Sequence, residues 1–206
     1  MGAEAQCTLR FNGRSSSGKV LLETEALIFR GAFRLVIPYA RMTGVTAAAG
    51  QLRVTFPDGV ALFHLGARAG SWAEKILHPK SLMDKLGVKP GMQAAVMGID
   101  DPAFFTQLAG RASRITRGRV RRNAGVIFFE VGRKQELRRL ASFASALRPD
   151  GAIWVVALRG STDVRESEVL SAGKSAGLVD VKVVRFSDTH TAHKFVIPLA
   201  ERKRRS

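Results

Sequence analysis

The residues with the strongest chemical character are six arginines that lie close together near the middle of the chain. They are Arg111, Arg114, Arg117, Arg119, Arg121 and Arg122, and no acidic residue occurs between Pro102 and Phe129. Guanidinium groups pair with phosphate and carboxylate oxygens, so the run could bind nucleic-acid phosphates or an acidic protein surface. The alternative is a solvated, charged edge that protects a sheet from aggregation.

A second candidate is the stretch 13–20, which reads Gly-Arg-Ser-Ser-Ser-Gly-Lys-Val. It matches the phosphate-binding pattern G-x-x-x-x-G-K, but Val20 stands where a Ser or Thr would hold magnesium. That chemistry also requires a helix after the lysine, whereas residues 20–25 have the pattern of a strand. We interpret the stretch as a flexible hairpin loop that binds no nucleotide.

A third candidate is a cofactor-binding loop at residues 97–102. These residues read Met-Gly-Ile-Asp-Asp-Pro and lie at the end of an apolar run. Dinucleotide enzymes and methyltransferases place several glycines at such a loop, so that the backbone can approach the ligand. Here one glycine precedes two carboxylates, which repel a pyrophosphate. S-adenosylmethionine carries no pyrophosphate, so the two carboxylates disfavour this cofactor less strongly. Between Leu108 and Ala124 there is also no room for the helix and strands that hold a ribose-binding acid. We therefore expect no cofactor.

The histidines and the single cysteine form no recognisable catalytic or metal-binding pattern. His190 and His193 flank a short polar segment with few acidic partners, which favours a turn over a metal site. His64 and His78 have no visible base or nucleophile beside them, so no catalytic triad is predicted. Cys7 lies in an apolar run and is expected to be packed rather than reactive.

The composition is that of a folded protein, and its net positive charge creates an electrostatic field that attracts polyanions. The 206 residues are 46% hydrophobic and 24% charged, with 33 basic and 17 acidic residues and a net charge of +16. Of the basic residues, 24 lie after residue 78. Arginine outnumbers lysine 23 to 10, a bias that a GC-rich genome also produces. Nucleic acid or an acidic protein is therefore the expected class of partner.

Several functional classes are disfavoured by the same sequence. No stretch approaches the roughly 18 uncharged apolar residues of a membrane-spanning helix. The first residues lack the pattern of a signal peptide, and one cysteine cannot form an intramolecular disulfide. We expect a cytoplasmic protein without a membrane span; its oligomeric state does not follow from the sequence.

The elements that must position these residues fall into two groups. In the first, short strand-like runs are expected at 7–12, 19–25, 26–30 and 33–38, with a hairpin at 52–65 and an amphipathic helix at 69–77. Short antiparallel strands closed by a helix describe a small barrel-like domain of mixed α+β class. This pattern resembles the pleckstrin-homology-like architecture.

The second group alternates buried strands with helices. Strands are expected at 92–99, 124–131, 152–158, 179–186 and 194–199, and helices at 103–108, 134–147 and 163–176. A turn is expected at 149–151 and a loop at 187–192. Alternation of this kind predicts an α/β domain with a parallel sheet, here with an antiparallel terminal pair.

Three segments of this second part carry a resemblance to a known family. They are residues 81–92 (SLMDKLGVKPGM), 147–155 (LRPDGAIWV) and 177–182 (GLVDVK). Together they resemble a bacterial domain-of-unknown-function family over about residues 80–200. That family is similar to reduced Rossmann-like methyltransferases, so the resemblance implies a fold and brings no established activity with it.

We therefore predict a β-rich pleckstrin-homology-like domain at 1–78, a linker at 79–91, a Rossmann-like α/β domain at 92–200 and a basic tail at 201–206. The expected function is non-catalytic: a regulatory or accessory protein whose basic surface binds an acidic protein or nucleic acid. The alternative is a degenerate or unusual S-adenosylmethionine-dependent methyltransferase. A deep pocket beside residues 98–100 and 131–132 would favour the enzyme.

Overall fold

The computed structural model describes residues 3–202 and divides the chain into two compact units, Met1–Lys80 and Ser81–Ser206. Each unit has its own hydrophobic core. Within the described residues, no helix has the length and apolar character needed to cross a membrane. The core of the second unit lies on both faces of its sheet.

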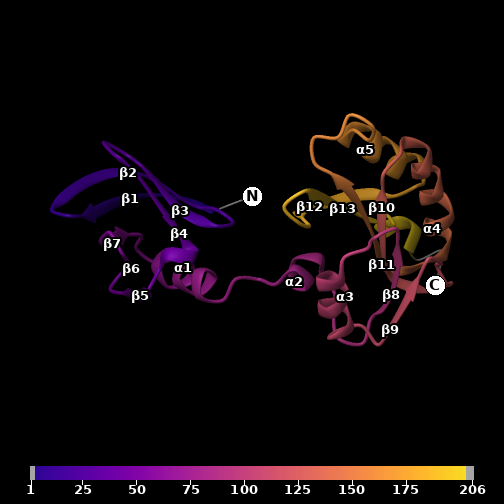
Figure 1. Ribbon diagram of the computed structural model, residues 1–206, viewed down its shortest axis with the longest axis horizontal. Coiled ribbons are helices and arrows are strands. Elements are labelled where there is room, and N and C mark those ends of the chain that lie inside the picture. Colours follow the sequence, from indigo (N-terminus) through magenta and orange to yellow (C-terminus); the bar gives the residue numbers. More distant parts are fainter. Residues whose placement is uncertain (1–2, 203–206) are drawn as a thin grey trace. The chain divides into compact units, whose positions relative to one another are not determined.

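The first unit is a curled sheet of seven antiparallel strands (Figure 1). Its strands are β1 (Ala3–Phe11), β2 (Arg14–Leu22), β3 (Ala26–Arg30), β4 (Arg34–Pro38), β5 (Gly44–Ala48), β6 (Gln51–Phe56) and β7 (Gly59–His64). They are hydrogen-bonded in the order β4-β3-β2-β1-β7-β6-β5. The short 3-10 helix η1 (Tyr39–Arg41) follows β4, and helix α1 (Arg68–Leu77) packs on β5 and β6.

Alternation of apolar residues explains why this sheet has one buried face. Leu52, Val54 and Phe56 of β6 are buried, while the residues between them are more exposed. Trp72 and Ile76 of α1 lie one turn apart and cover the same core. The predicted β-rich domain closed by a helix is thus present as a curled antiparallel sheet.

The stretch that imitates a phosphate loop is part of this sheet. Asn12 and Gly13 both have positive φ and form the two-residue turn between β1 and β2. Gly18 lies within β2, where a Cβ atom would overlap the carbonyl oxygen of Arg30 on β3. The expected flexible loop is therefore wrong: the second glycine of the pattern allows two strands to approach.

The second unit is a mixed six-stranded sheet with helices on both faces. Its strands are β8 (Gln93–Met97), β9 (Arg114–Arg117), β10 (Ala124–Val131), β11 (Leu147–Leu158), β12 (Val179–Arg185) and β13 (His190–Val196), in the order β12-β13-β11-β10-β8-β9. Strands β9, β8, β10 and β11 run parallel, and β13 is antiparallel to both of its neighbours. The predicted α/β sheet with an antiparallel terminal pair is confirmed at this level.

Six helices accompany this sheet: α2 (Leu82–Leu86), α3 (Pro102–Ala109), the 3-10 helix η2 (Lys134–Arg139), α4 (Leu140–Ala146), α5 (Glu166–Ser175) and α6 (Leu199–Arg202). One face, here the α5 face, carries Ile127, Phe129 and Val155 and packs against η2, α4 and α5. The other, the α3 face, carries Phe128 and Trp154 and packs against α2 and α3. Helices α3 and α4 lie on opposite sides of the sheet in Figure 1.

The segment expected as a linker at 79–91 contains structure. Ser81 caps α2 with a capping box to Asp84, and Gly87 ends the helix in the left-handed conformation. Met83 and Leu86 are buried in the core of the second unit. A five-residue helix is too short to show helical periodicity, so the sequence pattern did not indicate it.

Three other boundaries also differ from the sequence-based expectation. Strand β11 already begins at Leu147 and continues through the expected turn at 149–151, with a register shift against β10. The helix expected at 134–147 begins as the 3-10 helix η2. Strand β13 begins at His190, inside the loop expected at 187–192, because its residues pair with β11 and β12.

Candidate functional site

The topology of the second sheet identifies the edge where a ligand of an α/β protein would bind. From β8 the chain goes outward to β9 and then returns to β10 on the other side of β8. Ligands of such sheets bind outside the carboxyl ends of the strands at the point where the order reverses. In this unit that point lies between the ends of β8 and β10, at Gly98 and Val131.

This edge is acidic. Gly98 has a φ of +82°, and a Cβ atom there would lie 3.1 Å from the carbonyl oxygen of Glu130. Burial and the nearby charge of Asp100 raise the pKa of Glu130, and His190 opposes them; His190 Nε2 lies 3.5 Å from Glu130 Oε1. Asp101 caps α3 by accepting a hydrogen bond from the Phe104 amide. The negative charge at this edge of the sheet disfavours the binding of phosphate.

The neighbouring strand β9 corrects one sequence-based argument. The stretch between Leu108 and Ala124 does hold a strand, which is parallel to β8 and leads to the same edge. It ends at Arg117, whose guanidinium carbon lies 3.5 Å above the ring centre of Phe105 on α3. The strand is therefore present, but an arginine stacked on an aromatic ring stands where a ribose-binding acid would be needed.

The structure separates the six arginines of the run. Arg111 pairs with Asp84 at 2.6 Å and donates a hydrogen bond to the Val88 carbonyl, so it ties the end of α3 to α2. The hydrogen bond from Ser81 and the contact with Arg111 lower the pKa of Asp84 to about 2. Arg117 is stacked on the α3 face, as described above. These two arginines have structural partners.

Three of the other arginines converge. Arg114, Arg121 and Arg122 line one shallow hollow at the amino ends of β8 and β10, together with Gln93 and small or polar residues. Side chains on a strand alternate between faces, which puts Arg114 on the opposite face from Arg117. In the described part of the chain, no carboxylate lies within ion-pair distance of these three arginines. Arg119 is exposed in the turn that follows β9.

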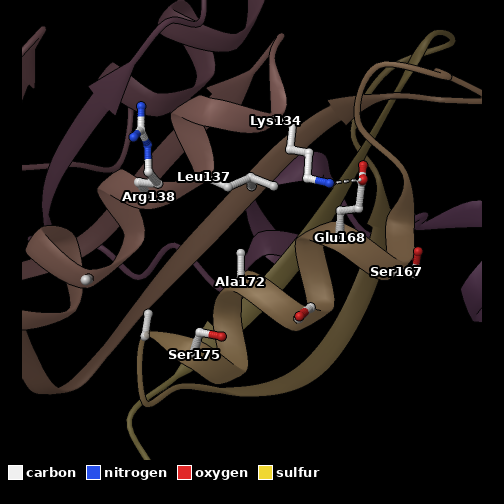
Figure 2. Close-up of a pocket in the computed structure, with 10 residues that line it drawn as sticks. Lys134, Leu137, Arg138, Ser167, Glu168, Ala172 and Ser175 are labelled. Carbon is white, nitrogen blue, oxygen red and sulfur yellow. Dashed lines mark ion pairs between the residues drawn. The ribbon is translucent and has the colours of Figure 1, made fainter.

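A separate groove of about 410 Å³ lies between η2 and α5 (Figure 2), and basic residues of η2 line one side of it. Lys134 and Glu168 form an ion pair of 2.8 Å at one end, and Leu137 and Ala172 face each other across the floor. Arg138 points away from this pair in Figure 2. Because Glu168 neutralises Lys134, Arg138 carries the remaining positive charge among the basic residues that line the groove.

The two late histidines lie on opposite faces of β13. His190 is directed to Glu130, whereas His193 is buried and lines a cavity of about 290 Å³ between the end of β11 and the start of α5. They do not share a site, and the described residues contain no cluster of three or more metal ligands. The signal for a buried His193 was present, because it alternates with Phe195 and Ile197.

Two further expectations can be compared with the structure. Cys7 is buried, and burial raises the pKa of its thiol to about 11, as expected for a packed cysteine.

None of the cavities described above is lined by Gly98, Asp100 or Glu130. The pocket that would have favoured an enzyme at this edge is not among them.

Comparisons with known proteins concern the fold. No protein-family profile and no curated protein sequence matches the chain. A SAM-dependent methyltransferase from Aquifex aeolicus is 13% identical with a TM-score of 0.48, over 61% of this chain and 93% of its own. A putative type 11 methyltransferase from Sulfolobus solfataricus is 12% identical with a TM-score of 0.45, over 58% and 91%.

A TehB-like SAM-dependent methyltransferase from Corynebacterium glutamicum is 14% identical with a TM-score of 0.39, over 63% of this chain and 96% of its own. These three solved structures are thus described as methyltransferases, two of them as SAM-dependent.

Proposed function

We propose that the second unit binds nucleic acid through the arginines around the hollow, and that this binding is its main function. The observation that supports the proposal is the convergence of Arg114, Arg121 and Arg122 without a carboxylate partner in the described residues. Unpaired guanidinium groups in a basic protein repel one another, and phosphates relieve that repulsion. Large apolar side chains, which anchor protein partners, do not line this hollow.

The proposal predicts binding to duplex DNA that is independent of sequence and falls steeply with salt. Each phosphate neutralised on B-DNA contributes roughly −0.9 to the slope of log K against log salt. Replacing Arg114, Arg121 and Arg122 with Ala should reduce the magnitude of the slope by about 2.7 if each arginine neutralises one phosphate. Fluorescence anisotropy over a salt series measures both the affinity and the slope.

A matched control removes the same charge elsewhere. Arg10, Arg34 and Arg53 are exposed residues of the first unit, and their replacement with Ala should change the slope little. The basic tail is tested separately by removing residues 203–206, which lie outside the described residues. Binding that survives the triple substitution at the hollow but vanishes without the tail contradicts the proposal and would favour an acidic protein partner.

A second candidate function rests on the acidic edge between β8 and β10. S-adenosylmethionine carries a sulfonium cation and ribose hydroxyls and no phosphate, which suits the carboxylates of Asp100 and Glu130. This candidate predicts that S-adenosylmethionine raises the melting temperature, since a ligand at 100 times its Kd adds about 2.7 kcal/mol to the free energy of unfolding. Glu130→Gln should reduce the rise, and no rise at any concentration rules the candidate out.

For the first unit we propose a pleckstrin-homology-like module. Its seven antiparallel strands and the single helix α1 that follows them support the proposal. We also propose that the second domain begins at Ser81 rather than after a linker, since Met83 and Leu86 belong to its core.

A further inference from the structure

The cavity beside His193 contains a polar atom without a hydrogen-bond partner. His193 is only 4% exposed, and no group of residues 3–202 accepts from or donates to its Nδ1 atom. Buried side-chain nitrogens nearly always have a partner, and leaving one without a partner destabilises the fold. The Nδ1 atom belongs to a residue that lines a space of about 290 Å³, so a molecule in this cavity can supply the missing partner.

The position of Glu166 limits the group that can fill this role. Its Oε1 atom lies 4.0 Å from His193 Nδ1, which is too long for a direct hydrogen bond. One small polar atom at about 2.8 Å from both would bridge them. A hydroxyl group suits this position, because it donates its one proton to the carboxylate and accepts a hydrogen bond from the Nδ1–H of the imidazole.

The other residues that line the cavity indicate which further groups the ligand carries. Ala157, Val164 and Val169 are buried and apolar, and they offer contact to a short carbon chain. Arg159 and Arg165 line the same cavity, and the Arg159 guanidinium also donates a hydrogen bond to the Asp188 carbonyl. The lining residues thus carry two positive charges against the one negative charge of Glu166. A net positive cavity of this kind favours a ligand with one negative charge.

We propose that this cavity binds a small hydroxycarboxylic acid, with its hydroxyl between His193 Nδ1 and Glu166 and its carboxylate toward the arginines. The site is separate from the hollow of Arg114, which lies at the amino ends of the strands, while this cavity adjoins the carboxyl end of β11. The inference goes beyond the proposed nucleic-acid binding and does not depend on it.

The imidazole of His193 reports directly on binding. In the full-length protein labelled with ¹⁵N-histidine, lactate and glycerate should shift the His193 Nδ1 resonance in a saturable way. A ligand of this size is expected to bind with a Kd of about 1 mM. Propionate lacks the hydroxyl and glycerol lacks the carboxylate, so each should bind at least about tenfold more weakly than glycerate.

Two variants test the assigned contacts. Glu166→Gln changes a largely exposed side chain and should remove most of the preference for lactate over propionate. His193→Phe should abolish the binding of both, which isothermal titration calorimetry measures because this variant lacks the reporting imidazole. His78→Phe, an exposed position in the first unit, is the matched control and should leave binding unchanged. The proposal is overturned if no probe moves the His193 resonance in the wild-type protein, since the cavity then holds only water. It is also overturned if lactate and propionate bind equally well.

Discussion

A fragment that starts at Ser81 should fold cooperatively, and a fragment that starts at Met92 should not. The shorter fragment lacks α2 and the turn after it, with Met83, Leu86 and Val88, each 2% exposed. Burying a side chain of this type contributes about 1.5–3 kcal/mol, so the three account for roughly 5–9 kcal/mol. That is comparable to the whole stability of a typical domain, about 5–15 kcal/mol.

The loss also uncovers the centre of the sheet. Trp154 is fully buried, and its indole N–H donates to the Leu86 carbonyl at 3.0 Å. Without α2 this donor and the ring itself face water. Urea unfolding of fragments 81–206 and 92–206, followed by circular dichroism, measures the difference. Leu86→Asp in the full chain tests the same contact without truncation, and equal unfolding midpoints for the two fragments would show that α2 is dispensable.

The parts of the fold that the sequence predicted are those with strong hydrophobic patterns. The continuous apolar run 124–131 indicated an internal strand, and the alternation at Leu52, Val54 and Phe56 indicated a half-buried one. Helix α2 was missed because five residues are too short to show helical periodicity, and strand β9 was missed because it has little apolar area of its own. Strand β9 packs a single apolar side chain, Ile115, and its pairing with β8 comes from backbone hydrogen bonds.

The arginines of the candidate site could be predicted from the sequence only as a group of six neighbours in the chain. In the structure, two of them make long-range contacts and do not lie at the hollow. Arg111 is paired with Asp84, which lies 27 positions away, and Arg117 is stacked on Phe105. Only the register of β9 and the path of the chain after it bring Arg121 and Arg122 beside Arg114. Contacts of this kind depend on tertiary structure, so residue spacing could not reveal them.

The buried histidine could be predicted only in part. The alternation of His193 with Phe195 and Ile197 indicates an inward-facing side chain. The cavity around it depends on where α5 begins, and the sequence-based helix at 163–176 began three residues before Glu166. The segment before Glu166 is a bent loop, in which the Ser161 hydroxyl accepts from the Asp163 and Val164 amides, and it contributes Ser161 and Val164 to the cavity wall.

Replacing Gly173 with alanine should destabilise the second unit, although the same change usually stabilises a helix. Gly173 lies within α5, and alanine at an exposed helix position is favoured over glycine by about 1 kcal/mol. Here the added Cβ atom would overlap the ring of Phe195 on β13, which is 1% exposed and has little freedom to move. Overpacking of a core costs about 1–3 kcal/mol, and an overlap with three ring atoms places this change at the upper end, about 3 kcal/mol. After the gain of about 1 kcal/mol from helix propensity, we expect a net loss of about 2 kcal/mol.

Gly70 provides the matched comparison, because it lies in α1 and no atom lies within 4 Å of the position of its Cβ. Gly70→Ala should therefore raise the free energy of unfolding by up to about 1 kcal/mol, which urea denaturation can measure. Phe195→Leu removes the ring edge that Gly173→Ala would strike, so the two substitutions together should cost at least about 1 kcal/mol less than the sum of their separate effects. Equal stabilisation by Gly70→Ala and Gly173→Ala would mean that α5 can move away from β13 without loss, and the tight packing of this helix on the sheet would then be wrong.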